Sequence, residues 1–146
     1  MNKNREKEKG QVSLIFIASM VIVIAAIALL VDGGRYLVMR NRARMMADAS
    51  ALSAASILDL EEARNGNFVL DRIGAKKTAE DIFSKNIETS PEYADFVLDE
   101  VRVQGNQIWV TVTGRSAPLF GSQWGLNYST TIISSARAAT GISTER

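Results

Sequence analysis

The candidate nucleophiles of this chain of 146 residues are its serines, because the chain contains no cysteine, and it contains no histidine either. Without histidine, a serine lacks the usual general base, and the chain also lacks the commonest metal ligand. Without cysteine, it has no thiolate and no disulfide. The residue types that remain for chemistry are carboxylates and lysines.

Adjacent carboxylates occur in pairs that could act as paired acids or hold calcium. These pairs are Glu61-Glu62, Glu80-Asp81 and Asp99-Glu100. Neighbouring side chains point apart on a helix or a strand, so no pair converges on one substrate. The lysines of a predicted helix lie on its solvated face, at Lys76, Lys77 and Lys85. We therefore expect no enzyme activity, no small-molecule substrate, no metal and no cofactor.

The element that dominates the sequence is an apolar segment, residues 12–31, which contains no charge, glycine or proline. A helix of this length rises about 30 Å, which matches the hydrocarbon core of a bilayer. The segment has no polar stripe, which a helix on a globular core would show. We predict a transmembrane helix whose partner is the lipid bilayer.

The alternative interpretation of this segment is a cleaved signal peptide. Ala26-Ile27-Ala28 has the small-residue spacing of a signal-peptidase site. The apolar run continues to Val31, however, and is longer than the roughly 7–15 residues of a signal h-region. We therefore expect the segment to remain as an anchor.

Charge is distributed unevenly about the apolar segment. Residues 1–10 and residues 32–58 each carry +2, whereas nine basic and twelve acidic side chains give residues 59–146 a charge of −3. The two segments that flank the span carry the same positive charge, so the positive-inside rule alone does not set the orientation of the helix in the membrane. A short tail before the span and a long domain after it favour the N-terminus inside and the C-terminal head outside the cytoplasmic membrane. The acidic head argues against nucleic acid as a partner.

A basic tail at residues 1–10 is expected to precede a long helix over residues 11–58. Charge becomes tolerable where the apolar segment ends, and two glycines there permit a bend. Arginine and tyrosine side chains at this exit are predicted to meet lipid headgroups. The predicted exit residues are Asp32, Gly33, Gly34, Arg35, Tyr36 and Arg40.

Beyond the exit, Val38, Met45 and Leu52 are spaced seven residues apart, as in a narrow apolar seam. Residues 47–56 are mostly alanine or serine, which lets another backbone approach closely. Together with Ala49, the seam residues are the predicted packing positions. We expect this face to pack beneath the chain's own head, and the alternative is a neighbouring helix.

Residues 59–146 are predicted to form a small α+β head. A polar turn at 61–66 and a helix at 75–86 come first. Apolar and polar residues then alternate on both sides of Gly105-Asn106, which predicts a β-hairpin with a two-residue turn. A β-branched run at 127–138 completes an antiparallel sheet of about three strands.

Large aromatic side chains lie in and near a glycine- and proline-containing loop at residues 117–126. Phe120 and Trp124 are expected to cover an open edge of the small core. Alternatively, they form with Trp109 a contact patch for a partner or for the membrane surface.

Three motifs follow one another in the N-terminal third of the chain: GQVSLIF at residues 10–16, VDGGR at 31–35 and RMMADASALSAA at 44–55. Together they resemble the N-terminal signature of TadE/TadG-like proteins. These are minor pilins, or pseudopilins, of the Tad (Flp-type) pilus and of related secretion systems. The resemblance covers about residues 10–56.

This resemblance implies a pilin-like architecture and a structural role through helix–helix and head–head packing. The implied partners are other pilin-like subunits and the pilus or secretion machinery, at the membrane, the cell surface or in a filament. Gly10-Gln11 would be the junction cut by a prepilin peptidase, or else Gly10 marks the start of the helix. Five positions into the cut chain, where pilins of this broad class commonly carry Glu, stands Ile15.

The alternative function is a membrane-anchored extracytoplasmic binding module or accessory factor. Such a protein would remain in the bilayer, would capture its partner through the aromatic patch and would never enter a filament.

Overall fold

The computed structural model describes residues 3–90, 95–123, 125 and 129–140. The contacts within the chain divide it into two compact units. We call Met1–Tyr36 with Ala117–Tyr128 the stem unit, and Leu37–Ser116 with Ser129–Arg146 the sheet unit.

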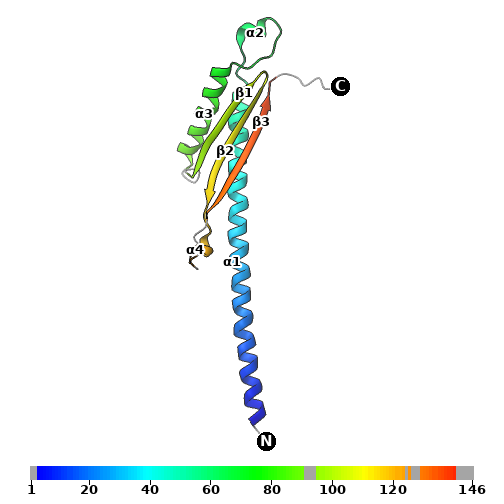
Figure 1. Ribbon diagram of the computed structural model, residues 1–146, viewed down its shortest axis with the longest axis vertical. Helices are drawn as coiled ribbons and strands as arrows, with labels where there is room; N and C mark the ends of the chain where they lie inside the picture. Colours follow the sequence, from blue (N-terminus) through cyan, green and yellow to red (C-terminus); the bar gives the residue numbers. More distant parts are fainter. Residues whose placement is uncertain (1–2, 91–94, 124, 126–128, 141–146) are drawn as a thin grey trace, which may run out of the picture. The chain divides into compact units, whose positions relative to one another are not determined.

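Helix α1 extends from Lys3 to Ala54 and contributes residues to both units (Figure 1). It begins before the predicted start at residue 11, and it remains helical through Gly33-Gly34. It also ends before the predicted end at residue 58. The early end has a local cause, because Leu58 pairs with Leu70 in an antiparallel bridge and therefore cannot continue the helix.

Aspartates cap two of the shorter helices. The shorter helices are α2 (Leu60–Arg64), α3 (Arg72–Thr89) and α4 (Leu119–Gln123). The Asp59 carboxylate accepts hydrogen bonds from two backbone N–H groups of α2, at 2.9 and 3.3 Å, and Asp71 accepts one from α3 at 3.0 Å. Such caps satisfy N–H groups that have no partner in the first turn. Residues 61–64 of the predicted polar turn are helical and residues 65–66 form the turn, and α3 is longer than the predicted 75–86.

Three antiparallel strands form a sheet with the order β1-β2-β3. They are β1 (Phe96–Gln104), β2 (Gln107–Ser116) and β3 (Thr130–Ala139). The predicted hairpin is confirmed, since Gln104 pairs with Gln107 across the two-residue turn. Gly105 has a φ of 60° there, in the left-handed region that favours glycine. The third strand starts later than the predicted residue 127, and residues 126–128 lie outside the described residues.

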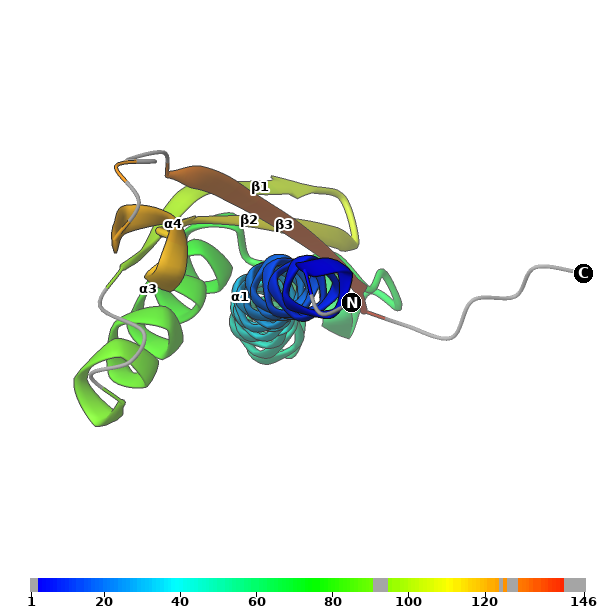
Figure 2. The same ribbon diagram turned by 90° about the horizontal axis from the view of Figure 1, so that it is seen from below.

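The core of the sheet unit lies between the sheet and two helices. The C-terminal part of α1 and helix α3 lie on the same side of the sheet (Figure 2). Ile108, Val110 and Val112 alternate along β2 and are fully buried. The buried face of α1 is made mostly of alanine and serine, and its residues are Met39, Ala43, Met46, Ala47, Ser50, Ala51 and Ala54. Small side chains let the helix approach the sheet closely.

Phe96 and Gly114 are paired residues of β1 and β2. The Phe96 ring is buried, and it occupies the space that a Cβ atom at position 114 would need. Glycine at position 114 therefore makes room for the largest side chain that β1 contributes to the core.

The seven-residue seam of α1 is not part of this core. Val38, Met45 and Leu52 are 50%, 65% and 72% exposed, and Ala49 is half-buried. The prediction that the seam packs beneath the chain's own head is wrong. The alanine-rich face of α1 is buried instead, and the seam is left exposed.

Ser50 lies in the buried face of α1, and its hydroxyl has no hydrogen-bond partner among the described residues. A buried hydroxyl without a partner costs about 1–3 kcal/mol. Ser50→Ala is therefore expected to raise the free energy of unfolding of the full chain in detergent by about 1 kcal/mol, measured by chemical denaturation. The matched control Ala47→Ser adds a second buried hydroxyl and should lower it. A less stable Ser50→Ala variant would contradict the expectation.

Candidate functional site

The apolar segment of α1 exposes its side chains on all sides. Its large apolar residues range from 40% exposed at Val31 to 76% at Leu29. The most apolar window of this helix has a mean hydropathy of 3.2, and none of that window is buried. A helix so apolar, and with no face covered by its own chain, fits a membrane anchor.

Directly after this segment, Asp32 holds the start of α4 within the stem unit. Its carboxylate oxygen Oδ1 accepts hydrogen bonds from the backbone N–H groups of Leu119 and Phe120, at 2.8 and 3.3 Å. Its oxygen Oδ2 accepts one from the N–H of Gly121 at 3.2 Å. We call these three hydrogen bonds the Asp32 clamp.

The clamp gives α4 a cap that its own sequence lacks. Helix α4 has five residues, too few to be stable alone, and its first N–H groups have no partner within the helix. The residue before it is Pro118, whose side chain has no acceptor. A carboxylate at this end forms charge-assisted hydrogen bonds and lies at the positive end of the helix. Asp32 thus performs from α1 the role that Asp59 and Asp71 perform locally for α2 and α3.

Sequence reasoning assigned Asp32 to the headgroup region and missed this contact. Its partners lie 87 to 89 residues further along the chain, and no local pattern marks a contact of that separation. The other predicted exit residues follow on α1. A Cβ added at Gly33 or Gly34 would meet nothing within 4 Å, so the chain itself does not require glycine there for space. Headgroup contacts of Arg35, Tyr36 and Arg40 stay predictions.

The predicted peptidase junction Gly10-Gln11 lies within α1, which begins at Lys3. The alternative, that Gly10 lies on the polar side of the helix start without being cut, stays open. Cleavage at this junction stays a prediction.

The predicted aromatic patch is divided between the two units. Trp109 is half-buried on β2 in the sheet unit, whereas Phe120 lies on α4 in the stem unit and is 43% exposed. Trp124 lies outside the described residues.

In the strand register, Trp109 stands between Arg102 and Arg137, so an arginine neighbours it on each side. The Arg137 guanidinium lies 5.6 Å from the centre of the Trp109 ring, in a cation–π contact. The sheet thus places one aromatic ring in a basic row. Within the described residues, no group of three or more carboxylates is arranged to hold a metal ion.

Asp32→Ala removes the acceptor of all three clamp hydrogen bonds. We expect α4 to open, so that amide hydrogen exchange in residues 119–123 accelerates at least about tenfold, which corresponds to about 1.4 kcal/mol. Hydrogen–deuterium exchange of the full chain in detergent, followed by mass spectrometry, measures this.

The matched control is Asp48→Ala, which removes an exposed α1 carboxylate that pairs with Arg44 at 3.7 Å. The control should leave exchange in residues 119–123 unchanged. Equal exchange in the wild type and the Asp32→Ala variant would show that α4 does not depend on the clamp.

Comparison with known families gives a match to the TadE/G-like Flp pilus-assembly family over residues 10–56. The matched segment includes the apolar segment, Asp32 and the whole of α1 that belongs to the sheet unit. Comparisons with curated proteins and with solved structures give no match.

Proposed function

Because residues 10–56 form a TadE/G-like Flp pilus-assembly domain, we propose that this protein is a single-pass, minor pilin-like subunit. It serves a Tad/Flp-type pilus or a related secretion apparatus, and its role is structural. The apolar segment of α1 anchors the chain in the cytoplasmic membrane, and α1 packs against the corresponding helix of neighbouring subunits.

The observation that carries this proposal is the exposed surface of α1. Residues 12–31 of the stem unit are apolar on all sides, and the seam of Val38, Met45 and Leu52 in the sheet unit is apolar and exposed as well. One helix therefore presents apolar side chains first to lipid and then along the outward face of the sheet unit. A surface of this kind suits a bilayer and a bundle of helices equally well.

Polar residues interrupt the seam and weaken the association of two α1 helices through it. Asn41 and Asp48 are exposed and lie between the apolar seam positions at helical spacing. Polar residues within a seam reduce its stability but fix the register of the paired helices. We infer that α1 helices associate when the membrane concentrates them side by side, and in one register.

The proposal places the N-terminus in the cytoplasm and the C-terminal head outside. It rests on the short basic tail before the apolar segment and on the long domain that follows it. Processing by a prepilin peptidase between Gly10 and Gln11 belongs to the same proposal.

The absence of cysteine makes single-cysteine crosslinking a direct test of the seam. Val38→Cys, Met45→Cys and Leu52→Cys are expected to give disulfide-linked dimers in native membranes under mild oxidation, because paired seams bring identical positions together. The matched control is Lys85→Cys, an exposed position on α3, which should remain largely monomeric. Non-reducing electrophoresis separates the two forms.

The alternative, an accessory factor that never enters a filament, makes the opposite prediction. It expects no more dimer at the three seam positions than at Lys85. That result would overturn the pilin-like proposal and leave the basic row around Trp109 as the better candidate for partner capture.

The N-terminal residue of the protein purified from its native membrane tests the processing step. We expect an intact mass that corresponds to a chain starting at Gln11, because the basic leader ends at Gly10 directly before the apolar helix. A chain that retains Met1 would contradict cleavage and would favour a permanent anchor. A start just after Ala28 would make the protein a secreted domain.

A further inference from the structure

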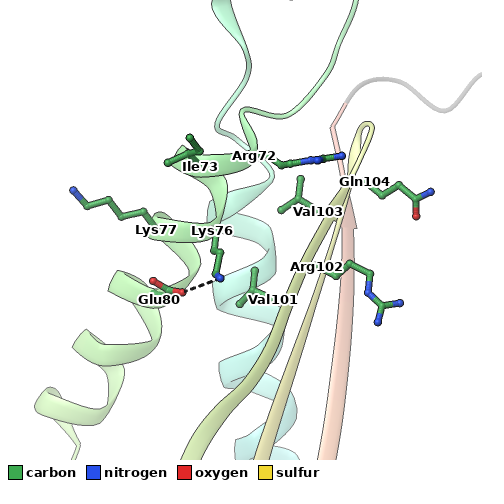
Figure 3. A pocket seen from close by; sticks show the side chains of 9 residues that line it. All are labelled: Arg72, Ile73, Lys76, Lys77, Glu80, Val101, Arg102, Val103 and Gln104. Atoms are coloured by element: carbon green, nitrogen blue, oxygen red, sulfur yellow. Dashed lines mark ion pairs between the residues drawn. The ribbon is translucent and has the colours of Figure 1, made fainter.

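A groove of about 710 Å³ lies between α3 and β1 in the sheet unit (Figure 3). The residues that line it come from the first turns of α3 and from the end of β1. They are Arg72, Ile73, Lys76, Lys77, Glu80 and residues 101–104.

The groove follows an edge of the sheet. The strand order places β1 at one edge, where it pairs with β2 along its inner side. Side chains alternate between the two faces of a strand, so a groove lined by four consecutive residues of β1 runs along the strand's edge.

The register defines which backbone groups face this edge. Gln104 and Gln107 close the two-residue turn as a hydrogen-bonded pair, and such pairs alternate along an antiparallel ladder. Arg102 therefore directs its N–H and C=O toward β2, whereas Val101 and Val103 direct theirs into the groove. Within the part of the chain that the structure describes, no backbone hydrogen bond to another element reaches these two residues.

The walls of the groove are basic. Four of its side chains are cationic, but Lys77 points away from the strand (Figure 3) and Arg102 pairs with Glu100 at 2.7 Å, so Arg72 and Lys76 are the cations that face an occupant. Glu80 is the single acid among the lining residues. Figure 3 shows Lys76 beside Val101, with its ammonium group 4.0 Å from Glu80, and Arg72 reaching toward Gln104. The Lys76–Glu80 pair is exposed on both sides and is therefore weak and exchangeable. Ile73, which is 83% exposed, adds an apolar contact.

The positive charge of the groove favours an acidic strand over a second copy of this chain. A second copy that paired through its own β1 would bring two sets of cationic walls together, which is unfavourable. An acidic strand would instead find cationic partners on α3 and unpaired backbone donors and acceptors on β1.

We propose that α3 and the edge of β1 form a docking groove for an extended acidic segment of another protein, which adds to the sheet as a fourth strand. Hydrogen bonds to Val101 and Val103 hold its backbone, as in other cases of strand addition. Its carboxylates pair with Arg72 and Lys76. This partner site goes beyond the proposed function and does not depend on the seam of α1.

A short blocked peptide that alternates valine and glutamate is the probe, and the same peptide with lysine in place of glutamate is its control. Fluorescence anisotropy with the full chain in uncharged detergent measures binding. We expect the glutamate peptide alone to bind, with an affinity that falls as salt is added. Amide hydrogen exchange at Val101 and Val103 should slow in the complex.

Two kinds of variant separate backbone pairing from charge. Val103→Pro removes one outward N–H, and proline is tolerated where the N–H faces away from the sheet. Arg72→Glu with Lys76→Glu reverses the charge of the wall. Each should weaken binding at least about tenfold. Lys85→Glu changes a lysine of α3 that does not line the groove, and it should bind like the wild type.

Several results would overturn the proposal. These are the absence of binding, equal binding of both peptides, and binding that neither variant weakens. Loss of binding in the charge variant alone, with Val103→Pro still folded and still binding, would show general attraction of anions without strand addition. Seam crosslinking at Met45→Cys reports on the proposed function separately, so either proposal can fail while the other holds.

Discussion

The sheet has three strands, and the contact on which its stability depends is the one between its inner face and the alanine-rich face of α1. A sheet this small cannot bury a core by itself. The three branched residues of β2, Ile108, Val110 and Val112, are fully buried because two helices cover them. That contact also sets the rotation of α1 about its axis in the sheet unit. With the alanines turned inward, the larger apolar side chains of the seam must face outward.

The sequence predicted the elements well and their contacts less well, for physical reasons. The apolar segment at 12–31 and the hairpin around Gly105 carry strong local signals, because composition and alternation depend on neighbouring residues. Periodicity shows which residues share a helix face, but it does not show which face meets the sheet. Val38, Met45 and Leu52 are more hydrophobic than the alanines opposite them, yet the alanines are the residues that are buried. The Asp32 clamp joins residues far apart in the sequence, so no spacing rule reveals it.

The outer surface of the sheet unit has a basic region on the sheet and an apolar region on α1. The edge of β1 carries a basic groove, and the row through Trp109 shares Arg102 with that groove and adds Arg137. The seam of α1 is apolar with isolated polar residues. Edge strands with cationic side chains resist pairing with copies of themselves. A subunit that associates through its helix is therefore protected from uncontrolled association through its sheet.

The Asp32 clamp has a mechanical consequence. Two residues, Ala117 and Pro118, separate the end of β2 from α4, so the clamp closes a ring that runs from Asp32 through the sheet and back to the same carboxylate. An axial pull on the apolar segment reaches the sheet by two routes in parallel: along the remainder of α1, and through three hydrogen bonds and a two-residue tether. Two of the three clamp hydrogen bonds are exposed to water, so we expect the clamp to open at a lower free energy than the buried core.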